Sequence, residues 1–130
     1  TGTTGISYNT AIGHRALRGS TTAASNTGTH NTALGYSAMV SNTPGAYNIA
    51  IGSGSMPQNT IGNNNVSIGY NSMLGNKSGQ DNVAIGSNAL YFNDGASGST
   101  AVGSGAMNYA NTTTGAITTY NKAVGALALL

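Results

Sequence analysis

The chain has 130 residues, enough for one domain or one stretch of a repeat array but not for two large lobes with a cleft. Gly, Ala, Asn, Thr and Ser make up 86 of these residues, and only six residues are charged, with a net charge of +2. This composition excludes a nucleic-acid binder that neutralises many phosphates. The absence of Cys excludes disulfides and thiolate sites, and no apolar run reaches the ~18 residues that a membrane-spanning helix needs.

A nine-residue pattern, Asn-x-Ala-[Ile/Leu/Val]-Gly-x-x-[Ala/Ser]-[Leu/Met], occurs seven times along the chain. The first copy begins at Asn9, and successive starts are 22, 17, 17, 17, 17 and 22 residues apart. A chain so poor in bulky side chains must gain its order from regularity, so the repeat is the main structural signal. We number the nine positions from the Asn; two copies depart from the pattern, with Ser99 at position one of the sixth copy and Ser67 at position three of the fourth.

Positions two to four of each copy are predicted to form a short strand, because the apolar unit is too short for a helix. Gly at position five would cost a helix about 1 kcal/mol, but it allows the backbone to bend or to be approached closely. Turn-forming clusters, such as residues 42–45 and 76–79, lie between copies. The predicted bend residues are Gly13, Gly35, Gly52, Gly69, Gly86, Gly103 and Gly125.

One strand, one bend, a second apolar segment and a turn make one rung of a solenoid. The sequence therefore predicts an all-β fold, a parallel β-solenoid of about seven rungs of 17–22 residues, stacked about 4.8 Å apart. Residues 1–130 form one domain, in which 1–8 end a rung, 9–120 make six complete rungs and 121–130 begin another. Neither end carries a polar cap, so we expect a stretch of a longer fibre or subunits that stack end to end.

Residues at the same position should lie above one another in such a stack. Side chains alternate along a strand, so positions two and four share one face and the Ala of position three lies on the other. We expect positions four and nine to form a narrow dry core. Its columns are Ile12, Leu34, Ile51, Ile68, Ile85, Val102 and Val124 at position four, and Leu17, Met39, Met56, Met73, Leu90, Met107 and Leu129 at position nine.

The Asn of position one is predicted to form a ladder in which each amide bonds to the rungs above and below. Each bond would contribute only ~1 kcal/mol, but amides left unpaired in a packed wall would cost more. The alternative is that Asn simply starts a turn. The ladder residues are Asn9, Asn31, Asn48, Asn65, Asn82 and Asn121.

A rung of 17 residues encloses only two or three bulky side chains, so association is the natural way to bury more surface. The small residues at positions three and eight would let a neighbouring chain approach closely, and we expect a trimer. Five extra residues lengthen the two 22-residue rungs, around 18–29 and 109–119, as contact loops or as tolerated insertions. Surface contacts are expected at Tyr36, Tyr70, Arg15 and Arg18, although Tyr side chains also pack between neighbouring rungs.

Groups suited to catalysis are scarce. His14 and His30 are the only side chains that exchange protons near neutral pH, and Asp81 and Asp94 are the only acids. A triad or metal site would have to be assembled from these four residues, and phosphate-binding and calcium-binding repeat motifs are absent. We therefore expect a protein that is not an enzyme and has no catalytic residue, no metal and no cofactor.

The Asn-Thr-Ala-Ile-Gly-x-x-Ala-[Leu/Met] units, which run from Asn9 to Leu129, resemble the head repeats of trimeric autotransporter adhesins. They are also similar to the 17-residue repeats in the shafts of phage tail fibres that end in a self-cleaving chaperone. The resemblance implies a trimeric, left-handed parallel β-roll or β-helix outside a cell or virion. No coiled-coil stalk, anchor barrel or chaperone accompanies the repeats in this sequence.

From these features we expect a structural and adhesive fibre segment that presents contact loops to a host-surface glycan or protein, without nucleic-acid binding or membrane insertion. The alternatives are an extracellular filament subunit that assembles end to end and, less favoured, a carbohydrate-binding module. A carbohydrate-binding module would depend on exposed Tyr such as Tyr36 and Tyr70.

Overall fold

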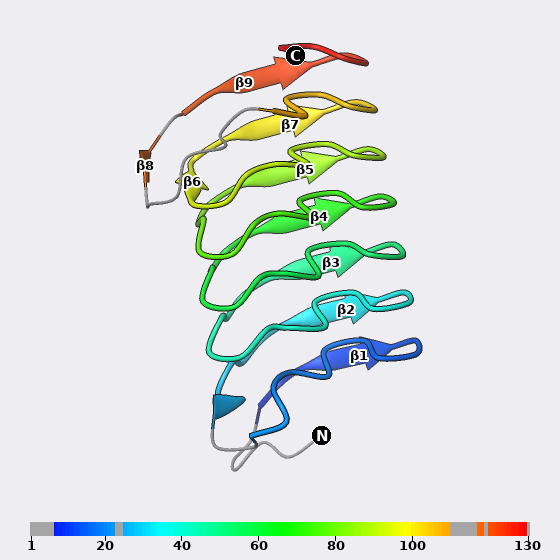
Figure 1. Cartoon of the computed structure of the whole chain (residues 1–130), viewed down its shortest axis with the longest axis vertical. Helices are drawn as coiled ribbons and strands as arrows, with labels where there is room; N and C mark the ends of the chain where they lie inside the picture. Colours follow the sequence, from blue (N-terminus) through cyan, green and yellow to red (C-terminus); the bar gives the residue numbers. More distant parts are fainter. Residues whose placement is uncertain (1–6, 23–24, 110–116, 119, 130) are drawn as a thin grey trace.

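A computed structural model describes residues 7–22, 25–109, 117–118 and 120–129 of the chain. Seven three-residue strands lie one above the next in a single parallel sheet, from β1 near the N-terminus to β9 near the C-terminus (Figure 1). Together with the absence of an α-helix from the described residues, this confirms the predicted all-β, solenoid-like architecture. The strands are β1 Thr10–Ile12, β2 Thr32–Leu34, β3 Ile49–Ile51, β4 Val66–Ile68, β5 Val83–Ile85, β7 Thr100–Val102 and β9 Lys122–Val124.

The strands pair in the register that the repeat predicts. Ala33 pairs with Ala50, and Ile68 pairs with Ile85, so each position meets its own counterpart on the next rung. The longer spacings do not disturb this register, because Val102 still pairs with Val124 across 22 residues. Part of each insertion, at 23–24 and 110–116, lies outside the described residues. Two short strands, β6 Ala96–Ser97 and β8 Ile117–Thr118, form a second parallel pair.

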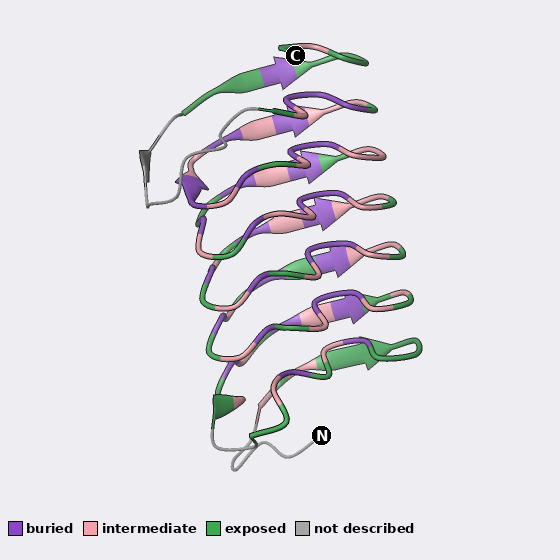
Figure 2. Cartoon of the chain, in the orientation of Figure 1, coloured by how far each residue is buried: buried purple, intermediate pink, exposed green. Residues whose placement is uncertain are grey.

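The inner face of the sheet carries the small residues, not the large ones. Ala33, Ala50, Ser67, Ala84 and Ala101, all at position three, are fully buried (Figure 2). They face position eight closely, since the hydroxyl of Ser55 donates to that of Ser67 at 2.7 Å. Because the two walls approach so closely, only small side chains fit between them.

The predicted aliphatic core column at position four is therefore wrong. Alternation correctly separates the two faces of each strand, but the larger side chains occupy the outer face. The exposed fraction reaches 60% at Ile12 and 78% at Val124, at the two ends of the sheet. Leu34 and Ile85 are also exposed, and Ile51, Ile68 and Val102 are half-buried.

Position nine supplies the bulk of the interior. Met39, Met56, Met73, Leu90 and Met107 are almost completely buried, and Leu17 is half-buried against the same cluster. Leu129, at the last rung, is 60% exposed and lies outside the core in which it was expected. Each interior rung thus contributes one long apolar side chain and two small ones to the core.

The glycines of position five lie in one row. Their φ angles fall between +125° and +136°, and a Cβ built on Gly69 would lie 2.5 Å from the carbonyl oxygen of Gly86. Real Cβ atoms do not approach a carbonyl oxygen so closely. The stack therefore requires glycine at position five both for its positive φ and for the close approach of the next rung. Position nine also has positive φ, with Met73 at +50°, a conformation held by the surrounding rungs at a cost of order 1 kcal/mol.

Candidate functional site

The Asn column of position one joins successive rungs. The side-chain oxygen of Asn31 accepts the backbone N–H of Asn48 at 2.9 Å, while its amide donates to the carbonyl of Gly45 at 2.8 Å. Amide-to-amide bonds add to this pattern between Asn48 and Asn65, at 3.2 Å, and between Asn65 and Asn82, at 3.1 Å. Asn9 makes the same two bonds at the first rung, whereas Asn121 is exposed.

A second Asn column carries the more regular amide ladder, and sequence reasoning assigned it only to turns. Asn59 donates to the side-chain oxygen of Asn42 at 2.7 Å, Asn76 to that of Asn59 at 2.9 Å, and Asn93 to that of Asn76 at 3.1 Å. These buried amides also donate to the carbonyl three residues ahead. The regular 17-residue spacing of the four residues was the available signal.

The outer face of the seven-stranded sheet carries an aliphatic stripe. It is formed by positions two and four. Position four is always Ile, Leu or Val, whereas position two is Thr or Lys in some copies. Contiguous exposed apolar surface of this kind marks an interaction site more often than scattered single residues do. We call this surface the outer aliphatic stripe; it consists of Ile12, Leu34, Ile49, Ile51, Val66, Ile68, Val83, Ile85, Val102 and Val124.

The titratable residues are dispersed. His30 stacks between Tyr8 and Tyr47, with ring centroids 4.8 and 4.7 Å apart, and His14 stacks on Tyr36 at 5.6 Å. Within the part of the chain that the structure describes, no three His, Asp or Glu side chains come together as metal ligands. Asp94 forms a 3.4 Å ion pair with Lys77, and Asp81 is exposed.

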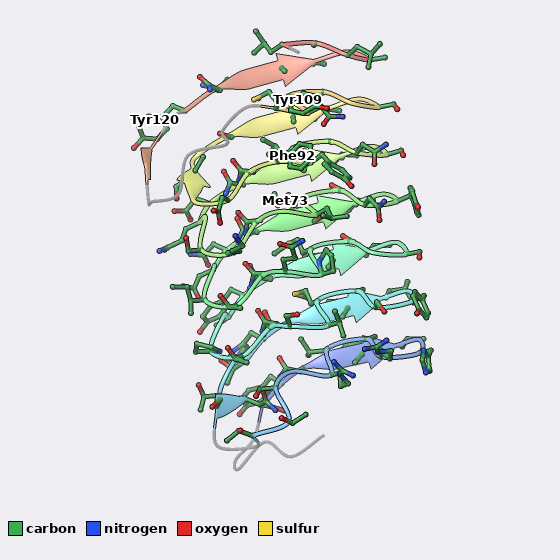
Figure 3. The ribbon with its side chains drawn as sticks, viewed as in Figure 1. Met73, Phe92, Tyr109 and Tyr120 are labelled. Carbon is green, nitrogen blue, oxygen red and sulfur yellow. The ribbon has the colours of Figure 1, made fainter. Side chains whose placement is uncertain are left out.

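The predicted contact residues are all exposed, but they do not form one site. Arg15, Arg18 and Tyr36 lie toward the N-terminal rungs, whereas Tyr70 borders an open groove of about 450 Å³ further along the rod. In this groove Phe92 stacks on Tyr109 with ring centroids 5.1 Å apart, and the two labelled rings lie on consecutive rungs (Figure 3). We call it the aromatic groove; it is lined by Tyr70, Asn71, Asn88, Tyr91, Phe92, Asn108 and Tyr109.

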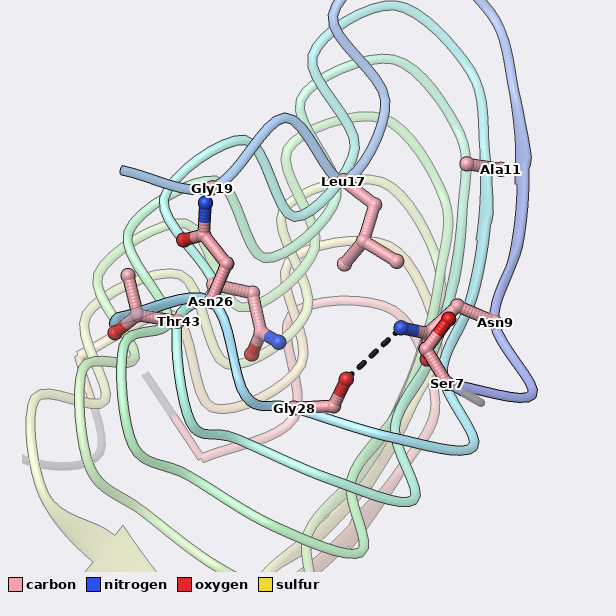
Figure 4. Close-up of a pocket in the computed structure, with 9 residues that line it drawn as sticks. Ser7, Asn9, Ala11, Leu17, Gly19, Asn26, Gly28 and Thr43 are labelled. Atoms are coloured by element: carbon pink, nitrogen blue, oxygen red, sulfur yellow. Dashed lines mark hydrogen bonds between the residues drawn. The ribbon is translucent and has the colours of Figure 1, made fainter. Parts of the chain in front are cut away.

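A smaller cavity of about 120 Å³ lies at the N-terminal end of the stack, lined mainly by residues of the first rung and by Asn42 and Thr43 of the second (Figure 4). Asn9 donates to the carbonyl of Gly28 at 2.8 Å across one side. Asn26 closes the loop on another side, because its amide both accepts from the N–H of Ser20 and donates to the Ser20 carbonyl. These hydrogen bonds explain how the long loop of the first rung packs against the stack. None of the residues that line the cavity is charged.

Comparison with known proteins gives no match: no family model, curated protein or solved structure is significantly similar to the chain. The described residues also include no helix of the length and apolarity needed to cross a membrane. The interpretation of the site therefore depends on the geometry of its own residues.

Proposed function

We propose that the chain is a structural and adhesive fibre segment, a homotrimeric rod that presents contact loops outside a cell or virion, as in a tail fibre shaft or an adhesin head. One observation carries the proposal: the outer aliphatic stripe runs along the whole described sheet while small residues occupy the inner face of the same strands. A chain that encloses Ala and exposes Ile has its larger apolar surface available for another chain.

The outer aliphatic stripe favours association of chains side by side, along the length of the sheet. Fully burying one Ile, Leu or Val side chain contributes about 1.5–3 kcal/mol, so several half-exposed residues on each copy provide a substantial driving force. Position four is aliphatic in every copy of the repeat, whereas position two changes to Thr or Lys, which suits a position nearer the edge of an interface. The number three and the left-handed winding come from the resemblance to trimeric adhesin and tail-fibre repeats.

The test is the native mass of the purified chain and of an Ile68→Asp variant, measured by light scattering during size-exclusion chromatography. We expect the unmodified chain to have three times the monomer mass. Ile68→Asp should lose the trimer while keeping its β circular dichroism, because Ile68 is on the outer face. Ser53→Asp, on an exposed loop residue, is the matched control and should remain trimeric.

The opposite results are equally clear. A monomeric mass for the unmodified chain at micromolar concentration would refute association through the stripe. If Ile68→Asp fails to fold, Ile68→Ser provides a milder test of the same position. Long fibres in electron micrographs, in place of discrete short rods, would favour the alternative of a filament that assembles end to end.

A further inference from the structure

The aromatic groove is distinct from the outer aliphatic stripe, and none of its residues belongs to that stripe. We propose that the aromatic groove binds a pyranose ring of a neutral glycan. This inference does not depend on the trimer or on the fibre role. It is argued from the residues that line the groove, from the hydrogen bonding of its side-chain amides and from the rungs on which its aromatic residues occur.

The lining contains only aromatic and Asn side chains. Four of the eight aromatic residues of the chain lie in this one groove, and none of the residues that line it is aliphatic or charged. A nucleic acid would require cations for its phosphates, and the lining has none. A neutral sugar ring offers the matching chemistry, since its C–H face packs on aromatic rings and its hydroxyls bond to amides.

The groove amides differ from those of the two buried Asn columns. The buried Asn columns use their amides in the ladders described above, but the side-chain amides of Asn71, Asn88 and Asn108 make no hydrogen bond to another described residue. An amide carries both a donor and an acceptor, as a sugar hydroxyl requires. Asn71 and Asn88 occupy the same position on neighbouring rungs, so they present equivalent groups about 4.8 Å apart.

Aromatic residues occur at positions ten and eleven in only two of the six complete rungs. Positions ten and eleven carry Pro57 and Gln58, then Leu74 and Gly75, before Tyr91 and Phe92. Phe92 stacks on Tyr109 and makes an edge contact with Tyr91, with ring centroids 4.6 Å apart, while the preceding rung has Gly75, without a side chain, at the position of Phe92. Phe92 is 39% exposed and Tyr70 is 59% exposed. A ring-stacking surface is thus built where the scaffold itself does not require one.

The experiment titrates the full chain with four neutral hexasaccharides, made of maltose-, cellulose-, xylan- and chitin-type units, and with a heparin hexasaccharide for comparison. Binding is followed by isothermal calorimetry and by NMR shifts. We expect saturable binding of at least one neutral probe and none of heparin. Phe92→Ser, which introduces the residue type found at Ser41, should weaken binding at least tenfold.

Two further variants separate binding from folding. Asn88→Gly suits the positive φ of +56° at this position, where other rungs carry Gly54 and Gly105, and it should also weaken binding. Tyr120→Ala is the matched control, because Tyr120 is 72% exposed and does not line the groove. It should leave binding unchanged.

The proposal fails if no neutral probe saturates the chain, if heparin binds in preference, or if Phe92→Ser binds as well as the unmodified chain. Native mass measured on the same samples keeps this result separate from the fibre proposal. A trimer without glycan binding would refute only the groove, and a glycan-binding monomer would refute only the trimer.

Discussion

Adding one methyl group to the glycine row tests the stacking geometry most directly. In Gly69→Ala the new Cβ would lie 2.5 Å from the carbonyl oxygen of Gly86, whereas ordinary van der Waals contact begins near 3.4 Å. Relief of the clash requires the two rungs to separate locally by about 0.9 Å. The bonds from Gly86 N–H to Ile68 and from Asn88 N–H to Tyr70, now 2.7 and 2.9 Å, would then exceed hydrogen-bond length.

The expected loss follows from these two bonds. A backbone group left without its partner costs about 1–3 kcal/mol, so two broken bonds cost about 2–6 kcal/mol. Placing Ala at φ +136° adds a further cost of order 1–3 kcal/mol. Because a whole domain is stable by only about 5–15 kcal/mol, Gly69→Ala should unfold a large fraction of the protein or lower its stability severely.

Gly125→Ala provides the matched control. Its φ is +125°, but a Cβ built there meets nothing within 4 Å, so it carries the backbone strain without the clash. Urea denaturation followed by circular dichroism, at one fixed protein concentration, should give Gly69→Ala a free energy of unfolding lower by about 2–6 kcal/mol than that of Gly125→Ala. Equal losses in the two variants would refute the close stacking of the glycine row.

Two further substitutions probe the interior. Met73→Ala should lower the free energy of unfolding by about 2–5 kcal/mol, because it empties a fully buried position. Met73→Leu should cost less than about 1.5 kcal/mol, since Leu90 fills the same position on the next rung. Asn59→Ala should lower the free energy of unfolding by about 1–3 kcal/mol for each buried group that loses its hydrogen-bond partner. Two side-chain amides do so, because the side chain of Asn59 donates to Asn42 and accepts from Asn76.

The same urea denaturation measurements test the core assignment of Met73 and the amide ladder of Asn59. Met73→Leu as damaging as Met73→Ala would contradict the assignment of position nine to a volume-limited core. For the ladder, the control is Asn64→Gly, at an exposed residue with a positive φ of +56°. A loss from Asn59→Ala no larger than that of this control would contradict the buried amide ladder.

The repeat spacing alone predicted the order and the register of the stacked strands. In a parallel in-register stack each residue meets the residue one period away, so a sequence period translates directly into a spatial column. The pairing of Ile68 with Ile85 and the row that contains Gly69 and Gly86 both follow from that rule. The 22-residue spacings were also readable, because an insertion between strands lengthens a loop at little entropic cost.

Alternation along a strand defines two faces, but it does not say which face points inward. Hydrophobicity favoured the side of Ile68, yet the interior is too narrow there, as the 2.7 Å contact between the Ser55 and Ser67 hydroxyls shows. Likewise, the spacing of Asn59 and Asn76 was visible in the sequence, but the inward direction of their amides depends on the backbone of the turn.

The sequence by itself determined a regular stack of short parallel strands, since like positions recur at a fixed period. Only the tertiary structure decided that Ala and Met fill the interior while Ile remains outside, because the separation of the walls sets the volume available to each side chain. It alone brought Tyr70, Phe92 and Tyr109 into one groove, because the winding of the backbone places residues of different rungs and different positions side by side.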